Sequence, residues 1–321
     1  MSELVRLYGM NIRTEIPTHQ HRPVPPGARP DLEINLGPPV PATDAAPPGK
    51  VLLDLRGNQQ YYTGTQHEDG FSLRFHGTCD IEIDSGLGRA VVHPVTGGES
   101  GMLSVLAGGT LLAFVLGLRR APVLHASAVH VGDEVLAFAG ASGMGKSTMA
   151  TLQCADGAAL VTDDLLRLDL TTRRPLCSLG ATELRLRRPA AQLADVQVGA
   201  GRQRATADDR NAFAPRTATT ESLPLATIVV PVIDRDPART AVRIESLAPL
   251  DALLLLTRFP RLLGWRSPAI LRDQLDQIGD LVERVPVHVA VVPAGPPFPS
   301  GLAGAVRDGV GLAASASTAA R

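Results

Sequence analysis

The stretch Gly140-Ala-Ser-Gly-Met-Gly-Lys-Ser147 decides how this chain is interpreted. It fits the pattern G-x-x-x-x-G-K-[ST], in which glycines let the backbone turn back and point N–H groups at phosphate oxygens. An apolar run, Val135–Ala139, precedes it, and Ser147–Gln153 can continue as a helix whose N-terminus favours negative charge. Strand, loop and helix follow in the order that a phosphate-binding loop requires. The alternative is a chance glycine-rich turn.

Lys146 supports the phosphate-loop interpretation. It and Lys50 are the only lysines of the chain, and every other basic residue is an arginine. A compact ammonium suits a loop that wraps phosphates, because it acts as a point charge among their oxygens. We therefore expect nucleotide contacts from the whole loop, which comprises Gly140, Ala141, Ser142, Gly143, Met144, Gly145, Lys146, Ser147 and Thr148.

Two adjacent carboxylates follow the next strand. The run Ala159–Thr162 is apolar and leads directly into Asp163 and Asp164. The carboxyl end of a strand is where open α/β sheets bind ligands. One carboxylate can hold Mg²⁺ together with the Ser147 hydroxyl, and the other can accept a proton from an attacking hydroxyl. Because side chains alternate along a strand, we expect the two to point in different directions. A capped turn at the end of the strand is the alternative.

Other polar residues are weaker candidates. Asp234 follows the strand-like run Ile228–Ile233 and is a competing metal-site carboxylate, ranked below Asp164 because Pro231 interrupts the run. Arg210 and Arg216 lie in the polar stretch 201–220, which we interpret as a lid whose arginines steady a phosphoryl group. Exposed loop arginines are the alternative.

Composition limits the classes of function. With 31 Lys and Arg against 32 Asp and Glu, the net charge is -1, which argues against a nucleic-acid groove or an anionic membrane surface. Three cysteines without C-x-x-C spacing indicate a reducing compartment, and the first residues do not resemble a signal peptide, so we expect a cytoplasmic protein. The apolar run 103–118 contains glycines and is interpreted as a buried helix that does not span a membrane.

The pattern of strands and turns predicts two domains. Residues 1–120 form a smaller β-rich domain with a proline-rich loop at 20–50, and residues 121–300 form an α/β domain that carries the phosphate loop. Strands are expected at 125–130, 135–139, 159–162, 226–233 and 285–292, and helices at 250–256 and 268–282. Pro231 predicts that the strand 226–233 ends early or lies at an edge. The Ala- and Ser-rich tail, 301–321, is expected to be frayed or a loose helix.

The chain resembles the HPr kinase/phosphorylase catalytic domain, and more closely the shorter HPr-kinase-like serine kinases of lasso-peptide and other modified-peptide gene clusters. The resemblance rests on Val123-Leu-His-Ala-Ser-Ala-Val-His130, Phe138-Ala-Gly-Ala-Ser-Gly-Met-Gly-Lys-Ser-Thr148 and Leu160-Val-Thr-Asp-Asp164. The opening stretch 7–16 and the run Val285-Pro-Val-His-Val289 are also similar. The resemblance implies a P-loop catalytic domain in which helices flank a mixed sheet.

The resemblance also implies roles for individual residues. Asp163 becomes the general base, Asp164 a magnesium ligand together with Ser147, and His125 a catalytic neighbour of the phosphates. Glu183 becomes a second metal-site or orienting carboxylate. A strand histidine that satisfies a backbone group and a solvated strand glutamate are the alternatives for His125 and Glu183.

We therefore expect an enzyme that uses ATP and Mg²⁺ to phosphorylate a serine of a peptide or small protein, such as a lasso-type peptide. The family's signature I-R-G-L-G is missing near Thr182–Pro189, so neither phosphorolysis nor HPr as a substrate is expected. A P-loop small-molecule kinase and a nucleotide-sensing regulator without transfer activity are the alternatives. The resemblance allows a homo-oligomer but does not require one.

Overall fold

The computed structural model describes residues 2–57, 60–187, 190, 193, 203–236 and 238–312. The chain divides into two compact units. Unit 1 consists of Met1–Ala121, Thr206–Asp208 and Arg261–Leu275, and unit 2 consists of Pro122–Ala205, Asp209–Pro260 and Asp276–Arg321. The chain returns to unit 1 at Arg261–Leu275. The sequence-based prediction placed this segment in the second domain, 121–300.

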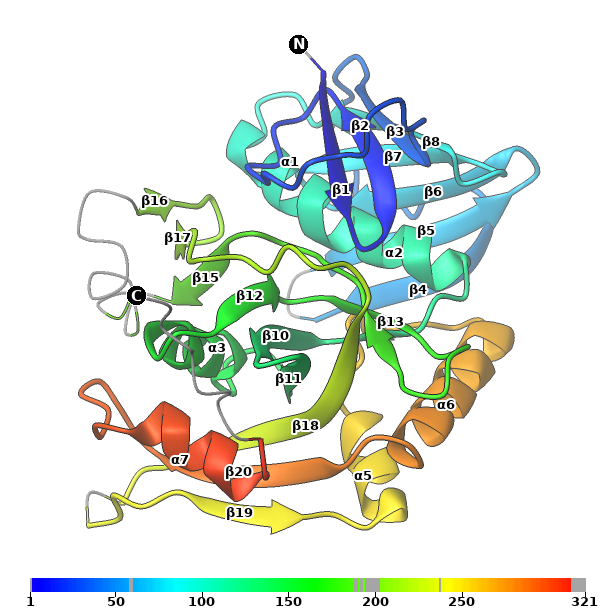
Figure 1. Cartoon of the computed structure of the whole chain (residues 1–321). Coiled ribbons are helices and arrows are strands. Elements are labelled where there is room, and N and C mark those ends of the chain that lie inside the picture. The colour runs from blue at the N-terminus through cyan, green and yellow to red at the C-terminus, as the bar shows by residue number, and fades with distance from the viewer. Residues whose placement is uncertain are drawn as a thin grey trace. The chain divides into compact units, whose positions relative to one another are not determined.

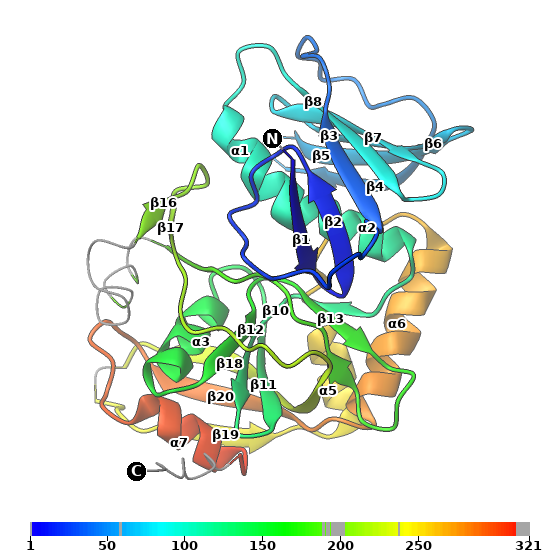
Figure 2. The ribbon, with the colours of Figure 1, turned by 45° about the horizontal axis from the view of Figure 1, so that its top comes forward.

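Unit 1 is built on one eight-stranded sheet with the strand order β1-β2-β3-β8-β7-β6-β5-β4 (Figure 2). Its strands are β1 (Glu3–Leu7), β2 (Met10–Thr14), β3 (Leu32–Leu36), β4 (Lys50–Arg56), β5 (Gln60–His67), β6 (Gly70–Phe75), β7 (Cys79–Asp84) and β8 (Arg89–Pro94). Strand β3 corrects the expectation of one continuous loop at 20–50. Leu32 and Ile34 alternate with polar residues and are fully buried, so burial overrides the surrounding prolines.

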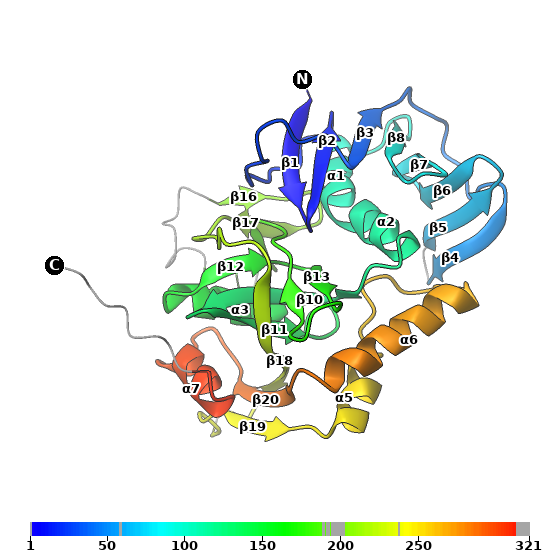
Figure 3. The same ribbon diagram turned by 45° about the vertical axis from the view of Figure 1, so that its right-hand side comes forward.

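One long apolar helical segment packs on this sheet (Figure 3). It comprises α1 (Ser100–Val105), the π-helix η1 (Leu106–Leu111) and α2 (Leu112–Leu118). The ring of Phe114 on α2 reaches Gly64 of β5, where a Cβ atom would lie 3.0 Å from the ring. By length and composition this 19-residue segment is able to cross a membrane, but 56% of its 18-residue window is buried, as in the core helix of a folded unit.

The segment Arg261–Leu275 of unit 1 contacts the same helical segment and sheet. Trp265 stacks on Phe114 with ring centroids 5.5 Å apart and an interplanar angle of 9°. Arg266 donates to the buried carboxylate of Asp54 at 2.6 Å, and the Asp54 N–H donates to the carbonyl of Gly264 at 2.9 Å. Gly264 has φ +89°, and a Cβ atom there would lie 2.1 Å from the Asp54 carbonyl oxygen, so only glycine fits.

Unit 2 contains a mixed nine-stranded sheet (Figure 1). Its strands are β9 (Val123–Leu124), β10 (Ala126–Val131), β11 (Glu134–Ala139), β12 (Ala159–Thr162), β13 (Leu166–Asp169), β14 (Leu176–Cys177), β18 (Leu223–Asp234), β19 (Arg243–Ser246) and β20 (Val287–Pro293). Strands β11, β18 and β20 are parallel, whereas β10 pairs antiparallel with both β11 and β12. The carboxyl ends of the three parallel strands therefore share one edge of the sheet, where α/β sheets bind ligands.

Helices cover both faces of this sheet. Val135 and Ala137 of β11 point into one buried cluster and Leu136 and Phe138 into the other, as the alternation of a fully covered strand requires. Helices α3 (Lys146–Ala155) and α7 (Leu302–Gly309) contribute to the cluster with Phe138. Helix α5 (Pro249–Leu256) and the end of α6 (Pro268–Val282) contribute to the other. The division between the units falls within α6, after Leu275.

A small sheet in unit 2 has the order β15-β17-β16. Its strands are β15 (Leu184–Arg187), β16 (Arg204–Ala205) and β17 (Arg210–Phe213). Strands β16 and β17 lie in the stretch 201–220 that was expected to be a lid, and residues 201 and 202 are outside the described residues. The described part of that stretch thus includes paired strands, because Ala212 and Phe213 are buried against β15.

Of the two expectations for Pro231, an early end of the strand is wrong and a position at an edge is confirmed. Strand β18 continues to Asp234 and pairs with β20 from Ile228 onward. Its pairing with β11 stops at Val229, so on that side the strand is already an edge where the proline lacks its N–H. The helix alternative for the tail holds at its start, where α7 forms with Leu302 and Val306 buried, and the expectation for 313–321 falls outside the described residues.

Candidate active site

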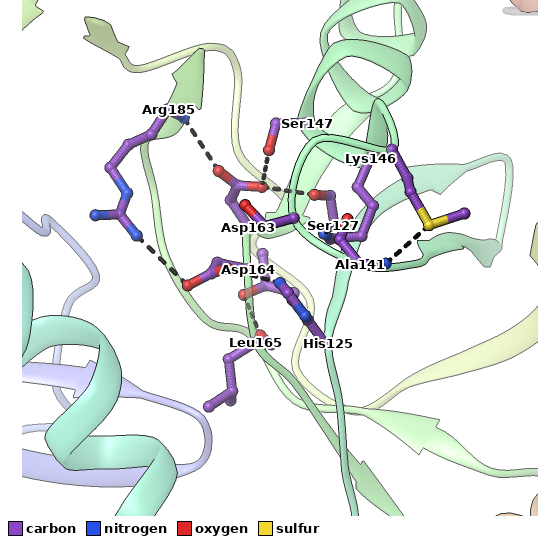
Figure 4. Close-up of polar contacts among 12 residues, drawn as sticks. His125, Ser127, Ala141, Lys146, Ser147, Asp163, Asp164, Leu165 and Arg185 are labelled. Atoms are coloured by element: carbon purple, nitrogen blue, oxygen red, sulfur yellow. Dashed lines mark hydrogen bonds and ion pairs between the residues drawn. The ribbon is translucent and has the colours of Figure 1, made fainter. Parts of the chain in front are cut away.

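The phosphate-loop sequence connects β11 to α3. Gly143 and Gly145 have φ values of +89° and +94°, which L side chains rarely adopt, and Gly145 is the N-cap of α3. Lys146, only 6% exposed, folds back over the loop and donates from Nζ to the carbonyl of Ala141 at 3.0 Å. The Met144 Sδ accepts from the Ala141 N–H at 3.1 Å, which closes the other side (Figure 4). The sequence thus builds a loop whose shape depends on its glycines and whose ammonium is already turned inward.

A cavity of about 400 Å³ opens in front of this loop. Its charged lining is strongly unbalanced, since among the described lining residues Asp164 is the single carboxylate. The basic side chains that line it are Lys146, Arg185, Arg187, Arg210 and Arg235. An excess of positive charge around a phosphate-type loop matches a polyanionic ligand such as a nucleoside triphosphate.

Asp163 lies at the end of β12 and is buried, with 3% of its surface exposed. Its Oδ1 accepts from the Ser127 hydroxyl of β10 at 2.6 Å and from the Ser147 hydroxyl of α3 at 2.8 Å. Its Oδ2 accepts from the backbone N–H of Arg185 at 3.0 Å (Figure 4). Three donors from three elements hold this carboxylate next to the loop, and Asp163 is not among the residues that line the cavity.

Asp164 points the other way. Its φ is +69°, a left-handed conformation that aspartate tolerates better than most residues. The turn is closed by the Leu165 N–H, which donates to the Asp163 carbonyl at 2.9 Å. The Asp164 carboxylate lines the cavity, 3.1 Å from Nε2 of His125 and 3.5 Å from Nη2 of Arg185 (Figure 4). The two carboxylates therefore diverge, as alternation along a strand predicts.

The partner of the loop serine differs from the sequence-based expectation. Ser147 was paired with Asp164 as a magnesium site, with Asp163 as the base. The Ser147 hydroxyl instead donates to Asp163, and Asp164 is the carboxylate in the cavity. Alternation separates the two side chains but cannot tell which one turns toward the loop, because that depends on the left-handed backbone at Asp164.

The remaining candidates fall into two groups. His125 and Arg210 line the cavity with the phosphate loop. Glu183, expected as a second metal-site or orienting carboxylate, accepts a hydrogen bond from Arg204 at 2.6 Å and does not line the cavity. Arg216 donates to the carbonyl of Gly157, also away from the cavity. These residues lie on short strands and loops whose pairing partners were not visible in the sequence.

Asp234, which the sequence suggested as a competing metal-site carboxylate, does not lie in the cavity of the phosphate loop. It pairs with Arg239 at 3.2 Å and Arg243 at 3.7 Å, and it lines an adjacent hollow that does not include the phosphate loop. The N–H of Asp236, followed by Arg239 and Arg243, lowers the pKa of the Asp234 carboxyl below its ordinary value. Asp234 is thus an ion-paired surface carboxylate at the end of β18.

Several site residues were not identified from the sequence. Arg187 donates from Nη2 to the Ser142 hydroxyl of the loop at 3.0 Å, and it lies on β15 two residues after Arg185. Arg185 and Arg187 are two positions apart on a strand, which places both side chains on one face. This spacing was the signal in the sequence that could have identified them. Ser127, which anchors Asp163, offered no comparable signal among the other small residues of β10.

A divalent cation fits the residues around Ser147. Because a carboxylate only accepts, the Ser147 hydroxyl donates its hydrogen to Asp163, which leaves the oxygen lone pairs available to a cation. In the described parts of the chain, this site included, no group of three or more His, Cys, Asp or Glu side chains is placed to hold a metal ion. The pair Ser147 and Asp163, completed by phosphate oxygens and water, is the donor set that Mg²⁺ commonly takes in such loops.

No family model and no curated protein matches this sequence. Among solved structures, the chain is similar to the Hpr(Ser) kinase/phosphatase from Coxiella burnetii, with 13% sequence identity and a TM-score of 0.28. That alignment covers 58% of this chain and 94% of the other. A likeness at this level does not establish a shared fold, so the function proposed next rests on the residues of the cavity.

Proposed function

We propose that this chain is a phosphotransferase that uses ATP and Mg²⁺ to phosphorylate a hydroxyl group. The observation that carries the proposal is the combination in one place of the phosphate loop, the Ser147–Asp163 hydrogen bond and the cavity-facing carboxylate of Asp164. A nucleotide-binding regulator needs the loop, but it has no use for a second carboxylate directed at the terminal phosphate. Two carboxylates with separate surroundings match the two tasks of a kinase, namely metal binding and proton acceptance.

The chain's own residues divide the work as follows. The loop N–H groups and Lys146 hold the phosphates, and Arg185, Arg187 and Arg210, which line the same cavity, neutralise phosphate charge. Asp163 keeps the Ser147 hydroxyl oriented, so that its oxygen faces a bound cation. The Mg²⁺ ion, when bound by Ser147 and Asp163, supplies positive charge to the phosphate oxygens.

Asp164 is the group that contacts the acceptor in this proposal. It accepts the proton of the acceptor hydroxyl while that oxygen forms a bond to the γ-phosphorus and the bond to the bridging oxygen of ADP breaks. His125 positions the carboxylate through its Nε2 contact. The roles of Asp163 and Asp164 are thus exchanged relative to the sequence-based expectation. Most of the rate enhancement comes from positioning and charge stabilisation.

The finer part of the proposal is the acceptor. We infer a serine of a peptide or small protein, as in the modified-peptide kinases that the sequence motifs resemble. The support is the order of the three motifs around His125, Lys146 and Asp163. We also place the protein in the cytoplasm and interpret Ser100–Leu118 as a buried helix, since more than half of its apolar window is covered.

The test is incubation of the full chain with Mg²⁺ and labelled ATP against serine-bearing peptides, and in parallel against small alcohols and sugars. Mass spectrometry should show a phosphate on a serine-bearing peptide with the wild type and none with Lys146→Ala. Transfer to a small alcohol or sugar alone would identify a small-molecule kinase. Tight ATP binding without any phosphorylated acceptor would favour the regulator and contradict the proposed transfer chemistry.

A further inference from the structure

The cavity in front of the phosphate loop has two chemically different ends. One end carries Asp164, Arg185 and Arg187, which suit phosphates and an acceptor. The other end is apolar and is lined by Pro231, Ile233, Val292, Pro293, Gly295 and Phe298, with Arg235 beside them. None of these described residues carries a carboxylate or amide side chain, so this end suits a flat apolar group rather than a further anion.

The strand order places these ends on opposite sides of the loop. Strand β11, which leads into the loop, has β10 and then β12 on one side, and β12 delivers Asp163 and Asp164. On its other side lie β18 and then β20, whose carboxyl ends deliver Ile233 and Pro293. A nucleotide whose terminal phosphate points toward Asp164 can therefore place its nucleoside toward Ile233 and Pro293.

Two residues at the apolar end have the form of a stacking platform. Ile233 is 41% exposed although it lies on a core strand. Phe298 is half-buried, and it packs against the same buried cluster as α3 and α7 while also lining the cavity. Gly295 makes room for the ring, because a Cβ atom there would lie 2.6 Å from Cγ and Cδ1 of Phe298. The ring thus has a fixed backing and an accessible side.

We propose that Phe298 and Ile233 form the site for the purine base of the nucleotide, with Phe298 as the stacking surface. This inference rests on the proposed function, because it takes the phosphates to lie in the loop. Aromatic rings bind bases through their π-faces and apolar area, which requires no hydrogen-bonding side chain at this end. Phe298 therefore contributes to the affinity for a nucleotide but not to the affinity for its phosphate chain alone.

The experiment compares Mg-ATP with Mg-tripolyphosphate, which has the phosphates but no base, by isothermal titration calorimetry. The wild type should bind ATP more tightly than tripolyphosphate. Phe298→Ala should weaken ATP binding by about 5- to 100-fold and leave tripolyphosphate binding unchanged. Gly295→Ala should have the same selective effect, because the new methyl group displaces a ring that is still present. Leu254→Ala, which removes an exposed leucine of α5, is the matched control and should change neither.

The outcomes separate this inference from the proposed function. Retained tripolyphosphate binding shows that a variant is folded, so equal losses for both ligands in Phe298→Ala would contradict a role in base binding. The inference is also overturned if wild-type protein binds ATP and tripolyphosphate equally well, since the phosphate loop would then be intact without a base site. If the wild type binds neither ligand, the proposed function fails together with this inference.

Discussion

Asp163 and Asp164 are neighbours in sequence but occupy different chemical environments. Asp163 is buried under three hydrogen-bond donors, whereas Asp164 lies in the cavity beside His125. A buried carboxylate that accepts several hydrogen bonds is suited to holding groups in place, here the Ser147 hydroxyl and a bound cation. A partly accessible carboxylate at the edge of a phosphate site is suited to meeting a substrate hydroxyl. The proposed mechanism depends on this difference.

Substitution of each aspartate should therefore give a different kinetic result. We expect Asp164→Asn to lower kcat by about 10²- to 10⁴-fold while the Kd for Mg-ATP stays nearly unchanged, because only the proton acceptor is lost. Asp163→Asn should weaken Mg-ATP binding by about 10- to 100-fold, because the Ser147 hydroxyl loses a charged partner. Steady-state kinetics combined with calorimetry distinguish the two. The reverse pattern would identify Asp163, and not Asp164, as the general base.

Sequence reasoning was most reliable where local chemistry decides the structure. The phosphate loop needs glycine at positive φ and a lysine at the start of the helix, and both requirements are visible in the residues 140–147. It was least reliable where a distant partner decides. The family resemblance implied a metal-site or orienting role for Glu183, but its contact with Arg204 depends on the pairing of a small sheet.

Helix α3, which follows the phosphate loop, is fixed to α7 by a buried polar cluster. Arg307 of α7 is 7% exposed, donates to Oε1 of Gln153 at 2.7 Å and pairs with Asp156. Nε2 of Gln153 donates to the carbonyl of Ala303 at 3.0 Å. These hydrogen bonds connect α3, the helix that follows the phosphate loop, to α7 in the tail of the chain.

Removal of this contact should destabilise unit 2. We expect Arg307→Met to lower the free energy of unfolding by about 2–4 kcal/mol, because it leaves the buried Gln153 without its donor. The neighbouring substitution Asp308→Asn alters an exposed side chain of the same helix and should change the free energy by less than about 0.5 kcal/mol. Urea denaturation measures both. Equal stabilities for Arg307→Met and the wild type would show that α7 does not support α3.

At the scale of the whole molecule, the division into units depends on a segment that returns late in the chain. Arg261–Leu275 belongs to unit 1, where Trp265 stacks on Phe114 and Arg266 binds Asp54. The sequence did not reveal this return, because nothing in the residues 261–275 distinguishes them from the α/β pattern around them. Contacts such as Arg266–Asp54, made across 212 positions of the chain, cannot be inferred from local periodicity.

Trp265 is the only tryptophan of the chain, so its fluorescence reports on this segment. Burial works against ionisation of Asp54, but hydrogen bonds from Thr63 and Arg56 and the charges of Arg56 and Arg266 outweigh it and hold its pKa below the ordinary value. The resulting stabilisation is complete above about pH 4, the pKa of an unfolded aspartate, and is lost as the pH falls through the lower folded pKa. Trp265 emission should therefore shift to longer wavelength only on acidification below about pH 4.

Asp54→Asn should remove most of this acid dependence and give a Trp265 emission at pH 7 already shifted toward that of exposed tryptophan. Arg13→Gln, which breaks an exposed ion pair with Glu33 in the same unit, is the control and should keep the wild-type profile. An unchanged profile in Asp54→Asn would mean that the acid transition does not arise from this carboxylate.

The central claim is that Lys146 and Asp164, which line one cavity, face the same terminal phosphate. The most direct test is a crystal structure of the full chain with Mg²⁺ and a non-hydrolysable ATP analogue. We predict that the phosphates lie within Gly140–Thr148, that the cation contacts the Ser147 oxygen, and that Asp164 is the carboxylate next to the γ-phosphorus. A nucleotide bound elsewhere, or a γ-phosphate that faces neither Lys146 nor Asp164, would contradict the account.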